Sequence, residues 1–258
     1  MPSTEIKHNI NLARIDLAAA YRMAERQGFN EGICNHFTMM VPGSDDRFLL
    51  IPYGLHWSEV TASNLIEVDF DGNVLDDGGY SKAFDDELRV DTSALCIHAP
   101  VHQARSDARC VFHTHMPYAT ALTMLDDFRF PMASQNELGF YGRVAYDDTY
   151  NGVAHDHDEG RRLAAVLGNN DILMMANHGV LITGETIGQA YYDMFYLEQA
   201  CRTLVLALRT GQDIRRVPQD VAAMTAKQRS RAAKTDNIRR HFNALKRLLD
   251  RDDSGYKD

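Results

Sequence analysis

The spacing of apolar residues predicts four amphipathic helices. The first runs from about 5 to 27, and the longest runs from 185 to 208. A third covers about 158–167. The fourth spans 91–104, where the opening Asp or Thr can cap the first turn. Its interior residues are Leu95, Ile97 and Val101. Each helix therefore has one apolar face to bury.

Between the helices, the period of the pattern changes to that of β-strands. The β-prone runs 36–41 and 47–51 flank a loop rich in turn residues, and the runs 65–70 and 74 onward flank Asp71-Gly72-Asn73. Two hairpins are therefore expected.

Further apolar runs at 109–115, 171–176 and 180–183 predict buried strands, with a tight turn at Asn177-His178-Gly179. Helices and strands alternate without the strict spacing of βαβ units. The pattern predicts a mixed α/β sheet, partly antiparallel and covered by helices.

Length and composition favour one globular domain with a tail. The chain has 258 residues, 45% of them hydrophobic and 24% charged, which is enough for one substantial core. We expect a domain over 1–214 and a C-terminal helical extension over 215–258, loosely attached because Pro218 and a polar, repetitive stretch begin it.

Charge and hydropathy exclude several classes of protein. No apolar run approaches the roughly eighteen residues of a spanning helix, and the N-terminus does not read as a signal peptide, so we expect a cytoplasmic protein. The net charge of -9 disfavours binding of nucleic acid, and the basic tail is best read as a solvated helix face. Four scattered cysteines predict buried small side chains and not disulfides; they are Cys34, Cys96, Cys110 and Cys201.

Three histidines are candidate metal ligands. His113 and His115 stand two apart on a predicted strand, so both imidazoles point to one face. His178 follows a predicted neighbouring strand, and Gly179 permits a sharp exit. Three imidazoles suit Zn, with Mn, Co or Fe as alternatives. A short motif in a chain with eleven histidines also admits another interpretation, in which the pair packs against polar neighbours and His178 caps a turn.

Five segments, in one order and at family spacing, resemble the class II aldolase/adducin family over about residues 10–210. They are Asn35-His36-Phe37-Thr38, Ile51-Pro52-Tyr53-Gly54, His98-Ala99-Pro100-Val101-His102-Gln103-Ala104-Arg105, Val111-Phe112-His113-Thr114-His115 and Ala176-Asn177-His178-Gly179-Val180. The resemblance implies a three-layer α/β/α sandwich with a central, mainly antiparallel sheet. It also implies a small-molecule substrate, the metal ligands His113, His115 and His178, and a homotetramer with active sites near subunit interfaces.

The chain departs from the family's sugar-phosphate aldolases at the acid/base position. Those enzymes carry a glutamate four residues before the histidine that corresponds to His98, and here that position is Ala94. A methyl group moves no proton. The family's phosphate cradle would map to Asn35, Gly54, Thr92 and Ser93, but Tyr53 is bulky where a threonine is common.

Two branches of the family lack that glutamate. The adducins are one, and the run Trp57-Ser58-Glu59-Val60-Thr61-Ala62-Ser63 resembles theirs. The other comprises metal-dependent decarboxylases of hydroxylated aromatic acids, which keep all three histidines. The sequence therefore predicts a metal-dependent carbon–carbon lyase, of aldolase or decarboxylase type, that acts on a small oxygenated anion through a metal-stabilised enolate. The alternatives are a non-catalytic adducin-like interaction domain and an epimerase.

The residue that replaces the glutamate is left open. Glu137, Tyr118, His98 and Tyr150 lie in segments that could border the site. For each of them a structural role is the preferred interpretation: Glu137 as a cap or ion-pair partner, Tyr118 as a packing residue, and His98 as support for a ligand.

Overall fold

A single eight-stranded sheet runs through the computed structural model, which describes residues 3–79, 88–154 and 156–258. The strand order is β4-β3-β2-β1-β5-β8-β7-β6, and neighbours are antiparallel except for the parallel pair β6–β7. The strands are β1 (His36–Met40), β2 (Arg47–Leu50), β3 (Ile66–Asp69), β4 (Val74–Asp76), β5 (Cys110–Thr114), β6 (Val144–Asp147), β7 (Ile172–Met175) and β8 (Gly179–Gly184). Both predicted hairpins and the predicted, mainly antiparallel sheet are confirmed.

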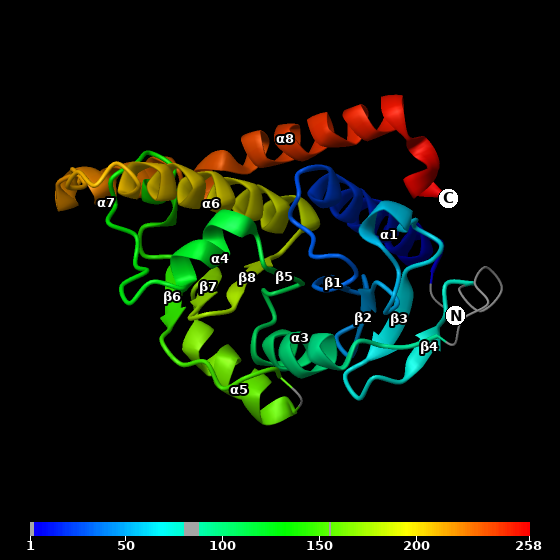
Figure 1. The fold of residues 1–258 in the computed structure, drawn as a ribbon. Helices are drawn as coiled ribbons and strands as arrows, with labels where there is room; N and C mark the ends of the chain where they lie inside the picture. Colours follow the sequence, from blue (N-terminus) through cyan, green and yellow to red (C-terminus); the bar gives the residue numbers. More distant parts are fainter. Residues whose placement is uncertain (1–2, 80–87, 155) are drawn as a thin grey trace.

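Helices cover both faces of this sheet (Figure 1). The helices are α1 (Thr4–Arg26), α3 (Thr92–Ala104), α4 (Pro117–Thr123), α5 (His157–Leu167), α6 (Ile187–Leu208), α7 (Gln219–Gln228) and α8 (Arg231–Asp252), with the short 3-10 turns η1 (Trp57–Glu59), η2 (Glu137–Phe140) and η3 (Ser254–Lys257). One face carries α3 and α5, and the other carries α1, α4 and α6, so the three-layer sandwich is confirmed. None of the helices in the described ranges is long and apolar enough to cross a bilayer.

The alternation along β5 decides which face each side chain joins. Cys110 and Phe112 belong to the apolar cluster on the α1 and α6 side, whereas Val111 belongs to the cluster with α3 and α5. Because side chains two apart share a face, His113 points with Val111 toward the α3 side.

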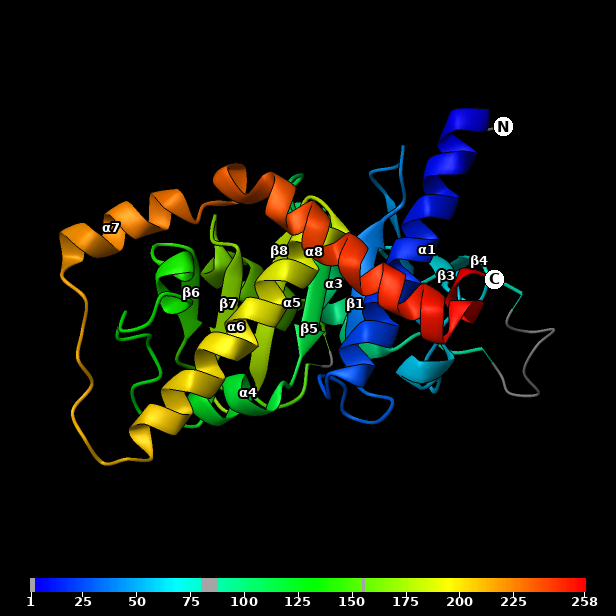
Figure 2. The same ribbon diagram turned by 90° about the horizontal axis from the view of Figure 1, so that it is seen from above.

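The C-terminal segment packs firmly, so the predicted loose attachment is wrong for α8. This helix lies across α6 and α1 (Figure 2) and buries an apolar stripe of Ile238, Phe242, Leu245 and Leu249. The following η3 buries Tyr256, whose carbonyl accepts a hydrogen bond from the Ala62 N–H at 2.9 Å. The helical spacing of these four apolar residues could have predicted from the sequence that α8 packs against the domain.

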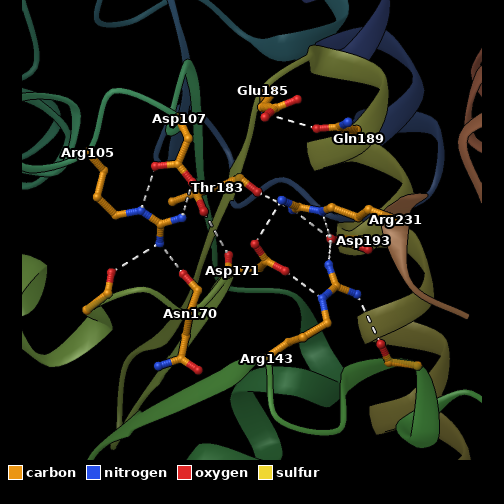
Figure 3. Close-up of polar contacts among 12 residues, drawn as sticks. Arg105, Asp107, Arg143, Asn170, Asp171, Thr183, Glu185, Gln189, Asp193 and Arg231 are labelled. Atoms are coloured by element: carbon orange, nitrogen blue, oxygen red, sulfur yellow. Dashed lines mark hydrogen bonds and ion pairs between the residues drawn. The ribbon is translucent and has the colours of Figure 1, made fainter. Parts of the chain in front are cut away.

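An ion-pair network fixes the start of α8 to the sheet (Figure 3). Arg231 donates to Asp171 at 2.9 Å, to Asp193 at 2.7 Å and to the Thr183 carbonyl. Arg143 donates to the same two carboxylates from the other side. Two arginines thus neutralise two aspartates, so the buried charges are paired.

Candidate metal centre

The three candidate histidines meet where β5 ends and β8 begins. In the antiparallel pair of these strands, Thr114 lies opposite Val180, which places the residue after β5 beside the residue before β8. One possible ligand atom from each of His113, His115 and His178 lies within 4.8 Å of the other two. The strand next to β5 is β8, and β7 lies one strand farther away than the sequence suggested.

Hydrogen bonds at Nδ1 leave the Nε2 atoms of two histidines free. His113 Nδ1 lies 3.0 Å from the Val180 carbonyl oxygen, and His115 Nδ1 lies 2.6 Å from Glu31 Oε2. Each Nδ1–H therefore donates outward, and each Nε2 keeps its lone pair. His115 Nε2 is buried without a hydrogen-bond partner among the described residues. An orphaned imidazole nitrogen beside two other imidazoles fits a divalent transition metal.

Burial keeps His113 and His178 neutral. Desolvation lowers the pKa of His113 well below its ordinary value, and the nearby His178 and His115 lower it further. Desolvation also lowers the pKa of His178 to about 4. A neutral imidazole has the lone pair that coordination requires, so both are ready to bind a metal at neutral pH.

Tight backbone geometry holds His115 in place. A Cβ at Gly179 would lie 2.6 Å from the Thr114 carbonyl oxygen and 2.7 Å from His115 Cδ2, so this position has no room for a side chain. On the other side, Asn35 adopts a left-handed conformation (φ 68°), and its Oδ1 accepts the His115 N–H at 3.1 Å. Strand and loop therefore enclose the ring between them.

A group of charged side chains lies beside His178. Arg162 donates to both oxygens of Asp147 and to Glu159, and these residues line a small hollow together with Tyr150 and His178. The Tyr150 ring centroid lies 6.1 Å from that of His178, and the tyrosine is exposed. Tyr150, one of the residues expected to border the site, thus has its ring next to a histidine of the cluster.

Two of the four predicted substrate-binding residues lie close to the histidines. Asn35 contacts His115 directly, and Ser93 Oγ lies 3.2 Å from Nε2 of His36, whose ring packs against His113. Gly54 lies in a loop after β2 and Thr92 is exposed. None of the described contacts joins Gly54 or Thr92 to the three histidines.

The predicted acid/base candidates have other partners. His98 is fully buried and hydrogen-bonds His36 and Thr38, which agrees with a supporting role. The Tyr118 N–H donates to Glu198, and Arg202 lies over the Tyr118 ring. Glu137 accepts from the Ala133 N–H and the Ser134 hydroxyl, and it lines a cavity at the end of α6. None of the described contacts joins Tyr118 or Glu137 to the histidines.

Sequence reasoning missed Glu31 and His36. Glu31 lies in the irregular stretch between α1 and β1, where no periodic pattern marks it. His36 lies opposite His113 in the antiparallel pair of β1 and β5. This contact can be predicted only when the pairing of the two strands is known. His36 and Thr38 do stand two apart on a predicted strand, and this polar alternation was a usable signal.

The sequence matches the model of the Class II Aldolase and Adducin N-terminal domain over residues 15–205. A putative aldolase class 2 protein of Caulobacter vibrioides is 36% identical over 83% of this chain and 80% of its own. The crystal structure of an aldolase II superfamily protein from Pseudomonas syringae is 36% identical and superposes with a TM-score of 0.87, over 97% of this chain and 96% of that one.

Adducins are relatives too. Rat alpha-adducin is 33% identical over 93% of this chain, which spans only 33% of the adducin's length. The L-fuculose 1-phosphate aldolase from Glaciozyma antarctica shares the fold, with a TM-score of 0.84 at 23% identity over 100% of this chain and 96% of that one. The relatives above 30% identity thus include a putative aldolase and adducins.

Proposed function

Because the chain belongs to the class II aldolase and adducin family, we propose that it is a metal-dependent carbon–carbon lyase acting on a small, oxygenated, anionic substrate. The observation that supports this most is the cluster of three histidines with the buried, unpartnered Nε2 of His115. A divalent cation there would supply a Lewis acid that stabilises an enolate when a carbon–carbon bond breaks. Zn suits the three imidazoles, with Mn, Co or Fe as alternatives.

The residues around the cluster have positioning roles in this proposal. Glu31 and the Val180 carbonyl orient two ligands, and Asn35 holds the backbone of His115. Ala94 is buried in α3 and moves no proton. Because retro-aldol cleavage needs a base and decarboxylation needs only an electron sink and a later proton donor, the site favours decarboxylation.

We further propose a homotetramer with active sites near subunit interfaces, located in the cytoplasm. Sedimentation velocity of the full chain is expected to give four times the monomer mass of 29.1 kDa.

Metal analysis tests the function. Protein purified without chelator is expected to hold about one transition-metal ion per chain, and His113→Ala is expected to lose it while keeping the native circular dichroism. The matched control is His8→Ala, on the exposed face of α1. Metal-dependent release of CO2 or of an aldehyde from a panel of hydroxy acids and sugar phosphates then identifies the reaction. No bound metal and no turnover in the wild type contradict the proposal.

A non-catalytic, adducin-like interaction domain is the second candidate, and Ala94 together with the adducin relatives favours it. In that case, His113→Ala leaves partner binding unchanged. An epimerase, the third, is recognised by an isomeric product without fragmentation.

A further inference from the structure

A cavity of about 420 Å³ lies where α6 ends, and the proposed chemistry does not use it. Glu137 on η2 forms part of its wall, and the last turns of α6 contribute Thr203, Leu204 and Ala207. Residues of the segment 210–215 close another side. The described lining includes neither the three histidines nor the residues that hydrogen-bond to them, so this cavity is separate from the metal centre.

Glu137 brings a buried carboxylate to this cavity without a cation beside it. The residue is 1% exposed. Its Oε2 accepts the Ala133 N–H at 2.8 Å, and its Oε1 accepts the Ser134 hydroxyl hydrogen at 3.0 Å. Both donors are neutral, and among the described residues Glu137 takes part in no ion pair. Because desolvation of a carboxylate is costly, a buried one usually has a cationic partner. The cavity beside Glu137 has room for a partner from outside the chain.

The hydroxyl groups of the cavity already donate their hydrogens inside the protein. Thr203 and Thr210 donate to main-chain carbonyls of α6, at 2.9 and 2.7 Å, and Ser134 donates to Glu137. A hydroxyl has a single hydrogen, so each of these three oxygens can only accept from a ligand. The carbonyl end of α6 adds a partial negative charge on the same side.

The rest of the lining indicates the shape and charge of the ligand. Leu204, Ala207 and Ile214 are apolar and can pack against an aliphatic stem. Asp213 and Arg215, both exposed, lie where the cavity opens to solvent. With Glu137, the described lining thus holds two carboxylates and one guanidinium, which favours a cation over an anion. The volume is in the range of about 300–1,000 Å³ that small-molecule sites have.

We infer that this cavity is a second binding site, which takes a small aliphatic primary amine as its ammonium, with the nitrogen toward Glu137 and the stem on Leu204 and Ile214. A primary ammonium has three N–H donors and no acceptor, which complements a carboxylate and hydroxyl oxygens that only accept. A carboxylate or phosphate ligand would bring acceptors to hydroxyls with no hydrogen left to donate. The site goes beyond the proposed lyase reaction and does not depend on it.

Saturation-transfer NMR of the full-length protein tests the site with butylammonium. Butanol is the matched neutral probe, because it has the same chain with a hydroxyl in place of the ammonium. The expected result is saturable transfer to butylammonium and binding of butanol at least about tenfold weaker, since a hydrogen bond to a charged group is the stronger kind. Equal affinities for the two probes, or no transfer to butylammonium, overturn the inference.

Glu137→Gln is expected to weaken butylammonium binding by about 10–100-fold, because it removes the charge and keeps the shape of the side chain. Glu185→Gln, exposed at the start of α6, is the control and is expected to bind like the wild type. If Glu137→Gln does not fold, Asp213→Asn at the exposed opening decides, with an expected loss of a few-fold. An unchanged affinity in folded Glu137→Gln, or in Asp213→Asn, contradicts the site.

His113→Ala separates this site from the metal centre, because an amine can also coordinate a metal ion. Butylammonium binding is expected to stay unchanged in this variant. Loss of binding would place the amine at the histidines and would overturn the inference. The readout is binding and not turnover, so a failed search for lyase activity removes the proposed function and leaves this site standing.

Discussion

At the scale of single residues, the two oriented histidines differ in what orients them. His113 donates to a backbone carbonyl, whereas His115 donates to the side chain of Glu31, which is well exposed. A carboxylate partner fixes the tautomer and the orientation of the ring, so the affinity of the proposed metal centre depends on this single side chain.

Glu31→Gln is therefore expected to weaken metal binding by about 10–100-fold, because an amide is a poorer acceptor and carries no charge. Competition with a chromophoric chelator measures the affinity. Glu5→Gln, an exposed glutamate in the first turn of α1, serves as the control and is expected to bind like the wild type. Equal affinities for both variants would show that Glu31 does not orient a ligand.

Gly179→Ala is expected to push His115 out of position, because the added Cβ meets the ring and the Thr114 carbonyl oxygen at under 3 Å. Overpacking of this kind costs about 1–3 kcal/mol of unfolding free energy and is expected to lower metal content as well. Urea unfolding and metal analysis provide the two readouts. In the control, Gly188→Ala on α6, the nearest atom is 3.6 Å away, so stability is expected to stay the same or rise.

At the scale of elements, α4 follows β5 in the chain and packs against α6. Both oxygens of Glu198 on α6 accept backbone N–H groups at the start of α4, from Tyr118 and Ala119, each at 2.9 Å. Burial raises the pKa of Glu198 to about 7, although these hydrogen bonds and Arg202 oppose the rise. The segment that carries His115 is thus held by a carboxylate that titrates near neutrality.

Stability is expected to fall as pH rises from about 4.5 to 7. The folded protein keeps a proton on Glu198 in this window while the unfolded chain releases it, so the loss reaches about 3 kcal/mol at pH 7. Urea unfolding at several pH values measures it. Glu198→Gln is expected to flatten this dependence, whereas Glu185→Gln, exposed at the start of the same helix, is expected to keep it. An unchanged slope in Glu198→Gln would assign the effect to other groups.

At this scale, much was predictable from sequence, because periodicity reports burial directly. The pairing of His113, on β5, with His115, just after it, followed from the two-residue repeat of a strand, and Gly179 marked the turn that brings His178 back. The partners of these residues were not predictable. Glu31 reaches His115 across 84 positions and His36 reaches His98 across 62, so both contacts depend on long-range pairing that no local pattern encodes.

At the scale of the whole molecule, the two ends of the chain stabilise each other through α8. Residues from α8 and η3 cover α1 and contact the loop around Ala62, while Arg231 fixes the start of α8 to β8 and α6. The helix α8 therefore packs on the rest of the described chain through α1 and α6.

Arg231→Met is expected to lower the free energy of unfolding by about 3–5 kcal/mol, because it leaves Asp193, a buried carboxylate, with one arginine partner fewer. Arg240→Met removes an exposed pair with Asp236 on the same helix and is expected to cost less than about 1 kcal/mol. Chemical denaturation of both variants measures the difference. A loss of the same size in both would mean that the network of Figure 3 contributes no more than a surface pair.

The hydrogen bond from His113 to the Val180 carbonyl affects how the site tolerates mutation. Every amino acid at position 180 offers the same main-chain oxygen, so His113 keeps its orientation through most substitutions on β8. The orientation of His115 has no such protection, because a single codon change removes the Glu31 carboxylate. Relatives without the proposed metal centre are therefore expected to have lost the Glu31–His115 pair first and to have kept His113 longer.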